Sequence, residues 1–153
     1  MTIAFETPDQ PDVHALIAEL DAYLYALYPA ESVYALDIRS LLEPHIRFAV
    51  ARDDAGAAIG CAAVLLTPEY GEIKRMYVRP VARGSGTAAR LIQLLEQTAA
   101  SAGCAEMMLE AGPAQPEALA FYTRSGFQQC GPYGDYPDDP HSVFMRKPLG
   151  DVA

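Results

Sequence analysis

The segment from Gly71 to Leu95 constrains the fold more than any other part of this chain. It reads GEIKRMYVRPVARGSGTAARLIQLL. Its first part, Glu72–Val78, has the β-branched and aromatic content of a strand, and Pro80 ends the strand because proline cannot donate to a sheet ladder. From Ala88 onward, apolar residues recur at three- and four-residue spacing, which predicts a helix. The segment is therefore a strand, a glycine turn and a helix.

The glycine turn has the character of an anion site. Two glycines at a helix start let backbone N–H groups approach an anion, and the helix N-terminus adds partial positive charge. Five basic residues and no acidic one lie between Ile73 and Leu95, in a chain whose net charge is −9. They are Lys74, Arg75, Arg79, Arg83 and Arg90. The pattern favours a phosphate-bearing ligand, with a solvated helix start as the plain alternative.

Length and composition limit the classes of protein to which the chain can belong. One domain over residues 1–153 fits the length, and 51% hydrophobic with 20% charged residues is typical of a soluble globule. No run approaches the roughly 20 apolar residues of a membrane span, and the N-terminus has no secretory pattern. We therefore expect a cytoplasmic protein without a membrane partner. The net charge disfavours nucleic acid, because binding phosphates requires a broad basic face.

The cysteines and histidines form no recognisable ligand set. Cys61, Cys104 and Cys130 lie far apart without CxxC spacing, which indicates reduced thiols. The three histidines are scattered as well. The sequence therefore predicts no metal site.

The remaining segments predict alternating strands and helices. Further strands are predicted at 2–6, 46–51, 57–67, 105–111, 127–131 and 142–147. Further helices are predicted at 12–27, 32–42 and 116–124, with Ser32 as the N-cap of the second. The order is β-α-α-β-β-β-α-β-α-β-β, with antiparallel hairpins and one β-helix-β crossover. This order predicts an α+β domain on a mostly antiparallel mixed sheet of about seven strands with four helices.

Three interpretations of the glycine turn compete. Gly84–Ala89 satisfies the G-x-G-x-x-G/A pattern of dinucleotide-binding folds, but those folds repeat βαβ units and only one crossover is predicted here. A Walker phosphate loop is disfavoured, because no Gly-Lys-Ser/Thr follows the glycines. The third interpretation uses more residues. Arg83–Ala88 matches Arg/Gln-x-x-Gly-x-Gly/Ala, and the sequence ALAFYTRSGF follows at Ala118–Phe127.

Together these two motifs resemble those of the GCN5-related N-acetyltransferase (GNAT) superfamily, namely its coenzyme A-binding motif and its downstream A-x-x-F-Y-x-x-x-G-F motif. The ending from Tyr133 to Met145 is similar to a bacterial branch of this superfamily. The resemblance implies a GNAT-like fold and an acetyl-CoA-dependent N-acetyltransferase without a metal. The acetyl group would move to the amine of a small molecule, amino-acid-like or a polyamine, by direct attack in a ternary complex.

The resemblance also implies which residues bind the coenzyme. Backbone N–H groups of the turn, assisted by one arginine, would hold the pyrophosphate: Gly84, Ser85, Gly86, Thr87, Ala88 and Arg83. The backbone of the preceding strand would pair with the pantetheine arm at Met76, Tyr77 and Val78. The side chains of these three residues are explained by an ordinary core strand. Gln115 stands where many members have asparagine, and its longer amide could contact the pantetheine or the splayed strand.

Two residues are the catalytic candidates that the resemblance implies. Tyr122 stands where the family often has a tyrosine that protonates the departing thiolate, and the alternative is an aromatic residue on a buried helix face. Glu72 stands where some members place a glutamate general base, and the alternative is a strand-end carboxylate paired with Lys74 or Arg75. Glu110, at the end of the neighbouring strand, is the second candidate for the base.

The resemblance further implies that the acceptor site is built by the first two helices, their loop and the last hairpin. The wall candidates there are Tyr25, Tyr28, Ser32, Tyr34, Tyr133, Asp135 and Tyr136, together with Glu110. Such tyrosine-rich walls suit a small molecule with an apolar body and a polar end. Lys74 and Arg75 alternate on the strand, so at most one is expected to face the pocket.

Other functions stay open at this point. A non-catalytic acyl-CoA-binding or regulatory module would keep Arg83 and the glycines but would not need Tyr122 or a carboxylate. A protein or peptide amine is an alternative acceptor. The terminal strands or the acidic loop could form an interface, so a homodimer is not excluded.

Overall fold

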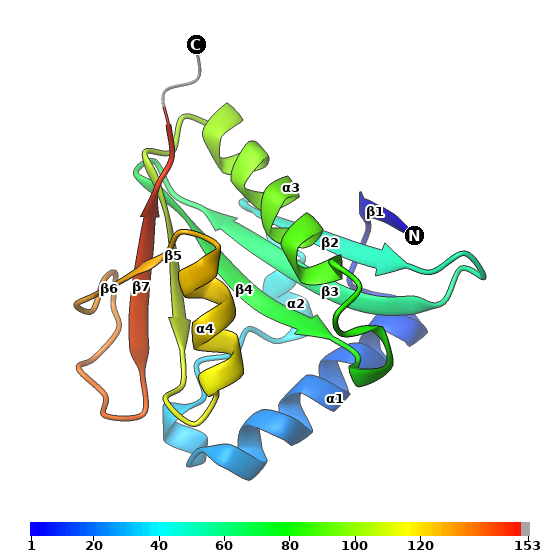
Figure 1. Ribbon diagram of the computed structural model, residues 1–153, viewed down its shortest axis with the longest axis horizontal. Coiled ribbons are helices and arrows are strands. Elements are labelled where there is room, and N and C mark those ends of the chain that lie inside the picture. Colours follow the sequence, from blue (N-terminus) through cyan, green and yellow to red (C-terminus); the bar gives the residue numbers. More distant parts are fainter. Residues whose placement is uncertain (151–153) are drawn as a thin grey trace.

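The computed structural model describes residues 1–150, and its elements follow the predicted order (Figure 1). The strands are β1 (Thr2–Phe5), β2 (Ile46–Arg52), β3 (Ala58–Leu66), β4 (Tyr70–Val78), β5 (Glu106–Ala111), β6 (Gln128–Cys130) and β7 (Val143–Pro148). The helices are α1 (Pro11–Leu27), α2 (Ile38–Leu41), α3 (Thr87–Ser101) and α4 (Pro116–Arg124). The predicted fold class, with a mixed sheet and four helices, is confirmed.

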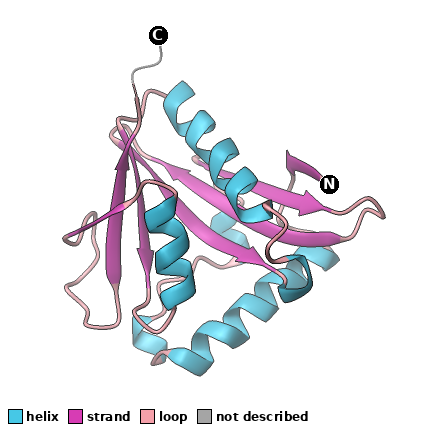
Figure 2. Cartoon of the chain, in the orientation of Figure 1, coloured by secondary structure: helices cyan, strands magenta, loops and turns pink. Residues whose placement is uncertain are grey.

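All seven strands belong to one twisted sheet in the order β1-β2-β3-β4-β5-β7-β6 (Figure 2). Only β4 and β5 run parallel, and α3 makes the crossover that a parallel pair requires. Their pairing covers three residues, Tyr70–Glu72 against Glu106–Met108. None of the helices within residues 1–150 is both long and apolar enough to cross a bilayer.

Helices cover both faces of the sheet. In Figure 1, α3 and α4 lie in front of the sheet and α2 lies behind it. The front core joins Leu91 and Leu95 of α3 to Ile73 and Leu109 of the central strands. The opposite core is built from the stripe of α1 at three- and four-residue spacing, which comprises Val13, Leu16, Ile17 and Leu20.

A β-bulge interrupts β4 at its centre. The register with β3 shifts so that Cys61 faces Tyr77 while Ala63 faces Lys74, which leaves two residues of β4 opposite one of β3. Arg75 takes a φ of 56° there and is the one non-glycine residue with positive φ among residues 1–150. The strict alternation of side chains along β4 is therefore lost at Arg75.

The helix predicted at 32–42 is the part of the fold that the sequence misplaces. Only Ile38–Leu41 is α-helical, while Ser32 ends a separate 3₁₀ turn at Ala30–Ser32. Asp37 rather than Ser32 caps the α-helix, through a 2.8 Å bond from the Ser40 N–H. The preceding carbonyl groups accept hydrogen bonds from β4 instead of from a helix. Lys74 Nζ donates to the Tyr34 carbonyl at 3.3 Å, and Arg75 Nε donates to the Leu36 carbonyl at 2.8 Å.

Gly71 marks the closest approach of β4 to α3. A Cβ at this position would lie 2.9 Å from the Cβ of Ala99 and 3.0 Å from a methyl group of Val64. We expect Gly71→Ala to lower the free energy of unfolding by about 1–3 kcal/mol, because packed core atoms must move. Denaturant unfolding measures this change. The control Gly131→Ala, where a Cβ meets nothing within 4 Å, should change stability little, and equal losses in both variants would contradict the assignment.

Candidate active site

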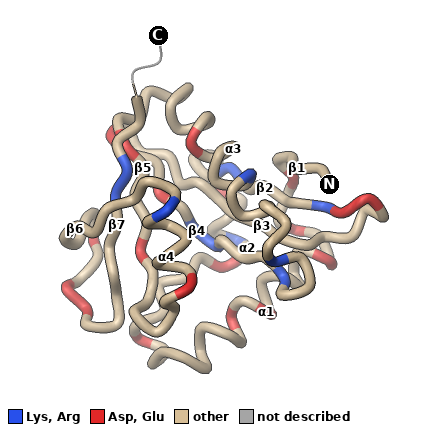
Figure 3. Tube along the Cα trace, viewed as in Figure 1, with Lys and Arg blue, Asp and Glu red and all other residues tan. Residues whose placement is uncertain are grey.

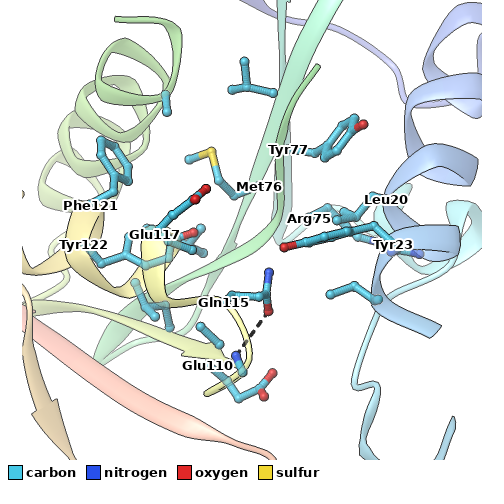
Figure 4. Close-up of a pocket in the computed structure, with 18 of the residues that line it drawn as sticks. Leu20, Tyr23, Arg75, Met76, Tyr77, Glu110, Gln115, Glu117, Phe121 and Tyr122 are labelled. Carbon is cyan, nitrogen blue, oxygen red and sulfur yellow. Dashed lines mark hydrogen bonds between the residues drawn. The ribbon is translucent and has the colours of Figure 1, made fainter. Parts of the chain in front are cut away.

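A cavity of about 660 Å³ opens where β4 and β5 diverge. The parallel ladder ends at Glu72 and Met108, whereas β4 stays paired with β3 and β5 with β7. The gap is closed by α1 and residues 32–36 on one side and by α4 and the glycine turn on the other. Figure 4 shows Leu20 and Tyr23 of α1 facing Phe121 and Tyr122 of α4 across the gap.

The glycine turn forms one end of this cavity. Gly84 and Gly86 have φ values of 81° and 82°, a conformation that L side chains rarely adopt. A Cβ on either would meet nothing within 4 Å, so the space in front of the turn is open. Gly86 caps α3 without a side-chain hydrogen bond, which leaves the first-turn N–H groups to an outside acceptor. The turn, with Thr87 and Ala88, is therefore built to receive an anion.

Two side chains at the turn stabilise its shape. The Ser85 hydroxyl donates to the Ala82 carbonyl at 2.5 Å and lies 2.8 Å from the Thr87 hydroxyl. Ser85 does not line the cavity, so its backbone N–H is the group that it can offer to a ligand. Arg83 does line the cavity, and its Nε donates to the Val78 carbonyl at 3.2 Å. Basic positions along β4 and at the turn are marked in Figure 3.

The outer half of β4 presents a backbone edge to the cavity. Met76, Tyr77 and Val78 line it, and beyond Glu72 no ladder joins β4 to β5 in the part of the chain that the structure describes. The Tyr77 hydroxyl donates to Glu19 of α1 at 3.1 Å. The Tyr77 side chain is thus held by the fold, while the main chain is free to pair with an extended ligand.

Tyr122 lies on α4, lines the cavity and is only 8% exposed. Its ring packs against Phe121 and Phe127, with centroids 5.6 and 5.9 Å away. Burial raises the pKa of its hydroxyl well above the ordinary value. Among the described residues this hydroxyl makes no hydrogen bond. Tyr122 is therefore a protonated phenol directed toward ligand space.

Gln115 connects the two sides of the cavity. Its Oε1 accepts a hydrogen bond from the Tyr28 hydroxyl at 3.0 Å and one from the Gly112 N–H at 3.3 Å, the latter dashed in Figure 4. A Cβ on Gly112 would lie 1.8 Å from the Tyr28 oxygen, so this contact requires glycine. Tyr28 and Gln115 both line the cavity, and the Gln115 amide nitrogen is the part left for a ligand.

Glu110 is a carboxylate that faces the cavity without an ion-pair partner within residues 1–150. It lies at the open end of β5, opposite Phe144 of β7. Burial raises the pKa of Glu110. The Ser142 side chain and the positive charge of Lys74 oppose the rise, and the negative charges of Glu72 and Asp139 add to it.

Glu72 lies behind the cavity wall and does not line it. The residue is 5% exposed, and its Oε2 accepts hydrogen bonds from Tyr133 at 2.9 Å and from Tyr136 at 2.5 Å. The same oxygen is 3.2 Å from Lys74 Nζ, so Lys74 rather than Arg75 is its ionic partner. Tyr133 lies behind the wall with it, whereas Tyr34 lines the cavity.

The expectation that at most one of Lys74 and Arg75 faces the pocket is wrong. Both line the cavity, because the bulge at Arg75 breaks the alternation of β4. Neither is an isolated charge. Arg75 Nη1 lies 2.6 Å from Asp21 of α1, and Lys74 is paired with Glu72.

Some residues of the site were not identifiable from the sequence. Asp139 accepts a 2.7 Å hydrogen bond from the Tyr34 hydroxyl, which raises the pKa of Tyr34 to about 12. His141 lines the cavity edge-on to Tyr28. Asp21 anchors Arg75. These partners are distant in sequence, and no motif links them.

The sequence of this chain was compared with protein families and with known proteins. The model of the Acetyltransferase (GNAT) family matches residues 13–127. A protein from Azospirillum brasilense named IAA acetyltransferase is 48% identical over 151 residues, which cover 97% of this chain and 98% of that protein.

Solved structures agree as well. A structure from Klebsiella pneumoniae, described as an acyl-CoA N-acyltransferase, is 35% identical with a TM-score of 0.82 and covers 97% of both chains. An aminoglycoside 6'-N-acetyltransferase complexed with coenzyme A shares the fold, with a TM-score of 0.73 at 16% identity over 100% of this chain and 99% of that one. The predicted resemblance and enzyme class are confirmed: this chain is an acyltransferase that belongs to the GNAT family.

Proposed function

We propose that this chain is an acetyl-CoA-dependent N-acetyltransferase whose acceptor is a small amine, and that the amine attacks the acetyl group directly in a ternary complex. The observation that carries the proposal is that one cavity joins the glycine turn, Tyr122 and Glu110. An anion site, a proton donor and a carboxylate thus lie along a single channel. A non-catalytic binding module would need only the first of these.

The chain's own groups fit the coenzyme. The left-handed glycines and the uncapped start of α3 suit a pyrophosphate, with Gly84–Ala88 as donors and Arg83 as the assisting charge. The unpaired backbone edge at Met76–Val78 suits the amide-bearing pantetheine arm, and the Gln115 amide lies across the cavity from it. Bound acetyl-CoA would supply an activated thioester, from which the acetyl group is transferred.

Two side chains would move protons. An amine acceptor is mostly protonated at neutral pH, so it must lose a proton before attack. Glu110, whose pKa is raised by burial and which has no ion-pair partner in the described part of the chain, can take that proton directly or through water. Tyr122 retains its proton over the usable pH range and can donate it to the thiolate that leaves. Glu72, the other carboxylate that the resemblance suggests as a base, does not line this cavity.

Charge pairing favours a cationic amine over an amino-acid-like acceptor. A substrate carboxylate would need a free cation at the acceptor end, but Lys74 is paired with Glu72 and Arg75 with Asp21. Glu110 instead offers a free carboxylate to an ammonium group, with Tyr28 and Tyr34 as the adjoining wall. An amino-acid-like amine and a peptide amine are the alternatives. The expected cytoplasmic location would suit any of them.

Gly86 should be required for coenzyme binding. Gly86→Val strains a left-handed residue and places a side chain in front of the anion site. We expect acetyl-CoA affinity, measured by calorimetry, to fall by at least about tenfold, or roughly 1.4 kcal/mol. Gly103→Val is the matched control, because Gly103 has a φ of 89° at the other end of α3. A similar affinity loss in both variants would mean that strain rather than the turn is responsible.

Tyr122→Phe should slow turnover without weakening coenzyme binding. Removing a positioned proton donor typically costs about 10²-fold or more in kcat. The release of CoA thiol from acetyl-CoA measures turnover, and calorimetry measures binding. Tyr25→Phe serves as control, because Tyr25 is 54% exposed and outside the cavity lining. Unchanged kcat in the Tyr122 variant would remove this hydroxyl from the mechanism.

The acceptor class is tested by the same thiol assay with polyamines, amino acids, lysine peptides and the IAA that the Azospirillum relative is named for. We expect polyamines to give the highest kcat/KM, with a rise toward higher pH as Glu110 ionises above its ordinary pKa. Glu110→Gln should abolish that rise and lower kcat/KM by roughly 10²-fold. No turnover with any amine would contradict the proposed function.

A stability measurement checks the Glu110 assignment without substrate. The folded protein disfavours ionised Glu110, since burial raises its pKa. Wild type should therefore lose stability relative to Glu110→Gln as pH rises from the ordinary carboxyl pKa through the raised native pKa, and the two should converge at low pH. A pH-independent difference would contradict the raised pKa.

A further inference from the structure

The Glu72 carboxylate occupies an unusual place for a charged group. Glu72 and Lys74 are two residues apart on β4 and so share a face, while Ile73 packs into the core under α3. Their face is turned away from α3, toward residues 28–37 and 131–142. Glu72 is 5% exposed there and outside the cavity lining.

The fold supplies enough partners to neutralise this carboxylate. Burying a charge is costly unless it is paired and hydrogen-bonded. One oxygen of Glu72 accepts hydrogen bonds from the hydroxyls of Tyr133 and Tyr136 and lies 3.2 Å from Lys74 Nζ. Both tyrosines belong to the segment between β6 and β7. Glu72 therefore holds that segment against β4.

Lys74 extends the same network to the segment after α1. Its ammonium contacts the Tyr136 hydroxyl, donates to the Tyr34 carbonyl at 3.3 Å and faces Glu72. Two of the three ammonium donors are used by Tyr136 and Tyr34, and Glu72 supplies the counter-charge. Lys74 is thus held by the protein itself and is not available to a substrate carboxylate.

Direct contacts between residues 28–37, after α1, and residues 131–142, between β6 and β7, complete the network. The Tyr34 hydroxyl donates to Asp139 at 2.7 Å, and the rings of Tyr34 and Tyr136 meet edge to face with centroids 5.4 Å apart. The same two segments line the acceptor end of the cavity through Tyr28, Tyr34 and His141. The position of that wall depends on the network behind it.

We propose that Glu72 is a positioning residue, which fixes the acceptor wall through Tyr133, Tyr136 and Lys74 rather than taking a proton from the substrate. The proposal rests on the proposed function only in calling this end of the cavity the acceptor end. It assigns the two neighbouring carboxylates different roles, with Glu72 behind the wall and Glu110 in front of it.

Hydrogen exchange on the free protein tests the structural half of the proposal. In Glu72→Gln and in Tyr133→Phe/Tyr136→Phe, amides of residues 131–142 should exchange at least about tenfold faster, because the segment loses its attachment to β4. Tyr70→Phe is the matched control. Its ring packs on Tyr133 with centroids 5.5 Å apart, but the hydrogen bonds to Glu72 within residues 1–150 come from Tyr133 and Tyr136 and not from the Tyr70 hydroxyl. Unchanged exchange in both test variants would overturn the proposal, whatever the enzyme acetylates.

Steady-state kinetics tests the functional half. Both variants should raise KM for the acceptor by about tenfold, while kcat and KM for acetyl-CoA stay within roughly threefold of wild type. The fall of kcat/KM toward acidic pH, which is the acidic limb of the pH profile, should also be kept. A general base at Glu72 predicts a different pattern, in which Glu72→Gln removes the acidic limb and most of kcat while the double tyrosine variant resembles wild type. That pattern would overturn the proposal.

A milder variant keeps the proposal testable if the other variants fail to fold. Tyr136→Phe removes one hydroxyl and leaves the Glu72–Lys74 pair intact, so it should shift exchange and KM in the same direction by a smaller factor. If wild type turned over no amine, the proposed function would fail, while the exchange experiment would still decide the role of Glu72.

Discussion

The divergence of β4 and β5 is the constraint on which the rest of this structure depends. The two strands pair for only three residues, and the fold then leaves the edge of β4 without a strand partner. Backbone N–H and C=O groups need partners when they are removed from water. A sheet that opens in this way can either fill the gap with its own side chains or keep it for an extended ligand. Here the gap is a cavity, with the glycine turn at one end and Glu110 at the other.

The bulge at Arg75 adds a second constraint, which explains the segment after α1. It turns two consecutive basic residues toward the same cavity, and the positive charge of each then requires an acidic or hydrogen-bonding partner. Asp21 pairs with Arg75 and Glu72 with Lys74, and the main-chain carbonyls of Tyr34 and Leu36 each accept a hydrogen bond from one of these two basic side chains. The extended backbone at Tyr34 and Leu36 presents these carbonyls to β4, where a helix would direct them along its own axis. The segment is extended for this reason, although its composition is compatible with a helix.

Local signals account for most of what the sequence predicts correctly. Helix α4 has the predicted bounds, Pro116–Arg124, because proline at its first position and Gly126 after its end are signals contained within the segment itself. The glycine turn is equally local. The partners of Glu72 are not, since Tyr133 and Tyr136 follow it by 61 and 64 residues. The bulge, and with it the orientation of Lys74 and Arg75, depends on the pairing of β3 with β4, which no periodicity encodes.

Environment rather than residue type separates the two glutamates of the central strands. Glu72 and Glu110 lie on adjacent parallel strands, and a motif-based comparison cannot rank them as bases. Glu72 has two hydroxyl donors and an ammonium around one oxygen, so a proton taken up there would disrupt bonds that hold the wall together. Glu110 has no such ion pair among the described residues, and burial raises its pKa against the opposing effects of Ser142 and Lys74. A carboxyl that can gain and lose a proton without rearranging its neighbours is the better proton acceptor. The network around Glu72 bears on Glu110 as well, because it pairs Lys74 with Glu72, and the positive charge of Lys74 is one of the influences that lower the pKa of Glu110.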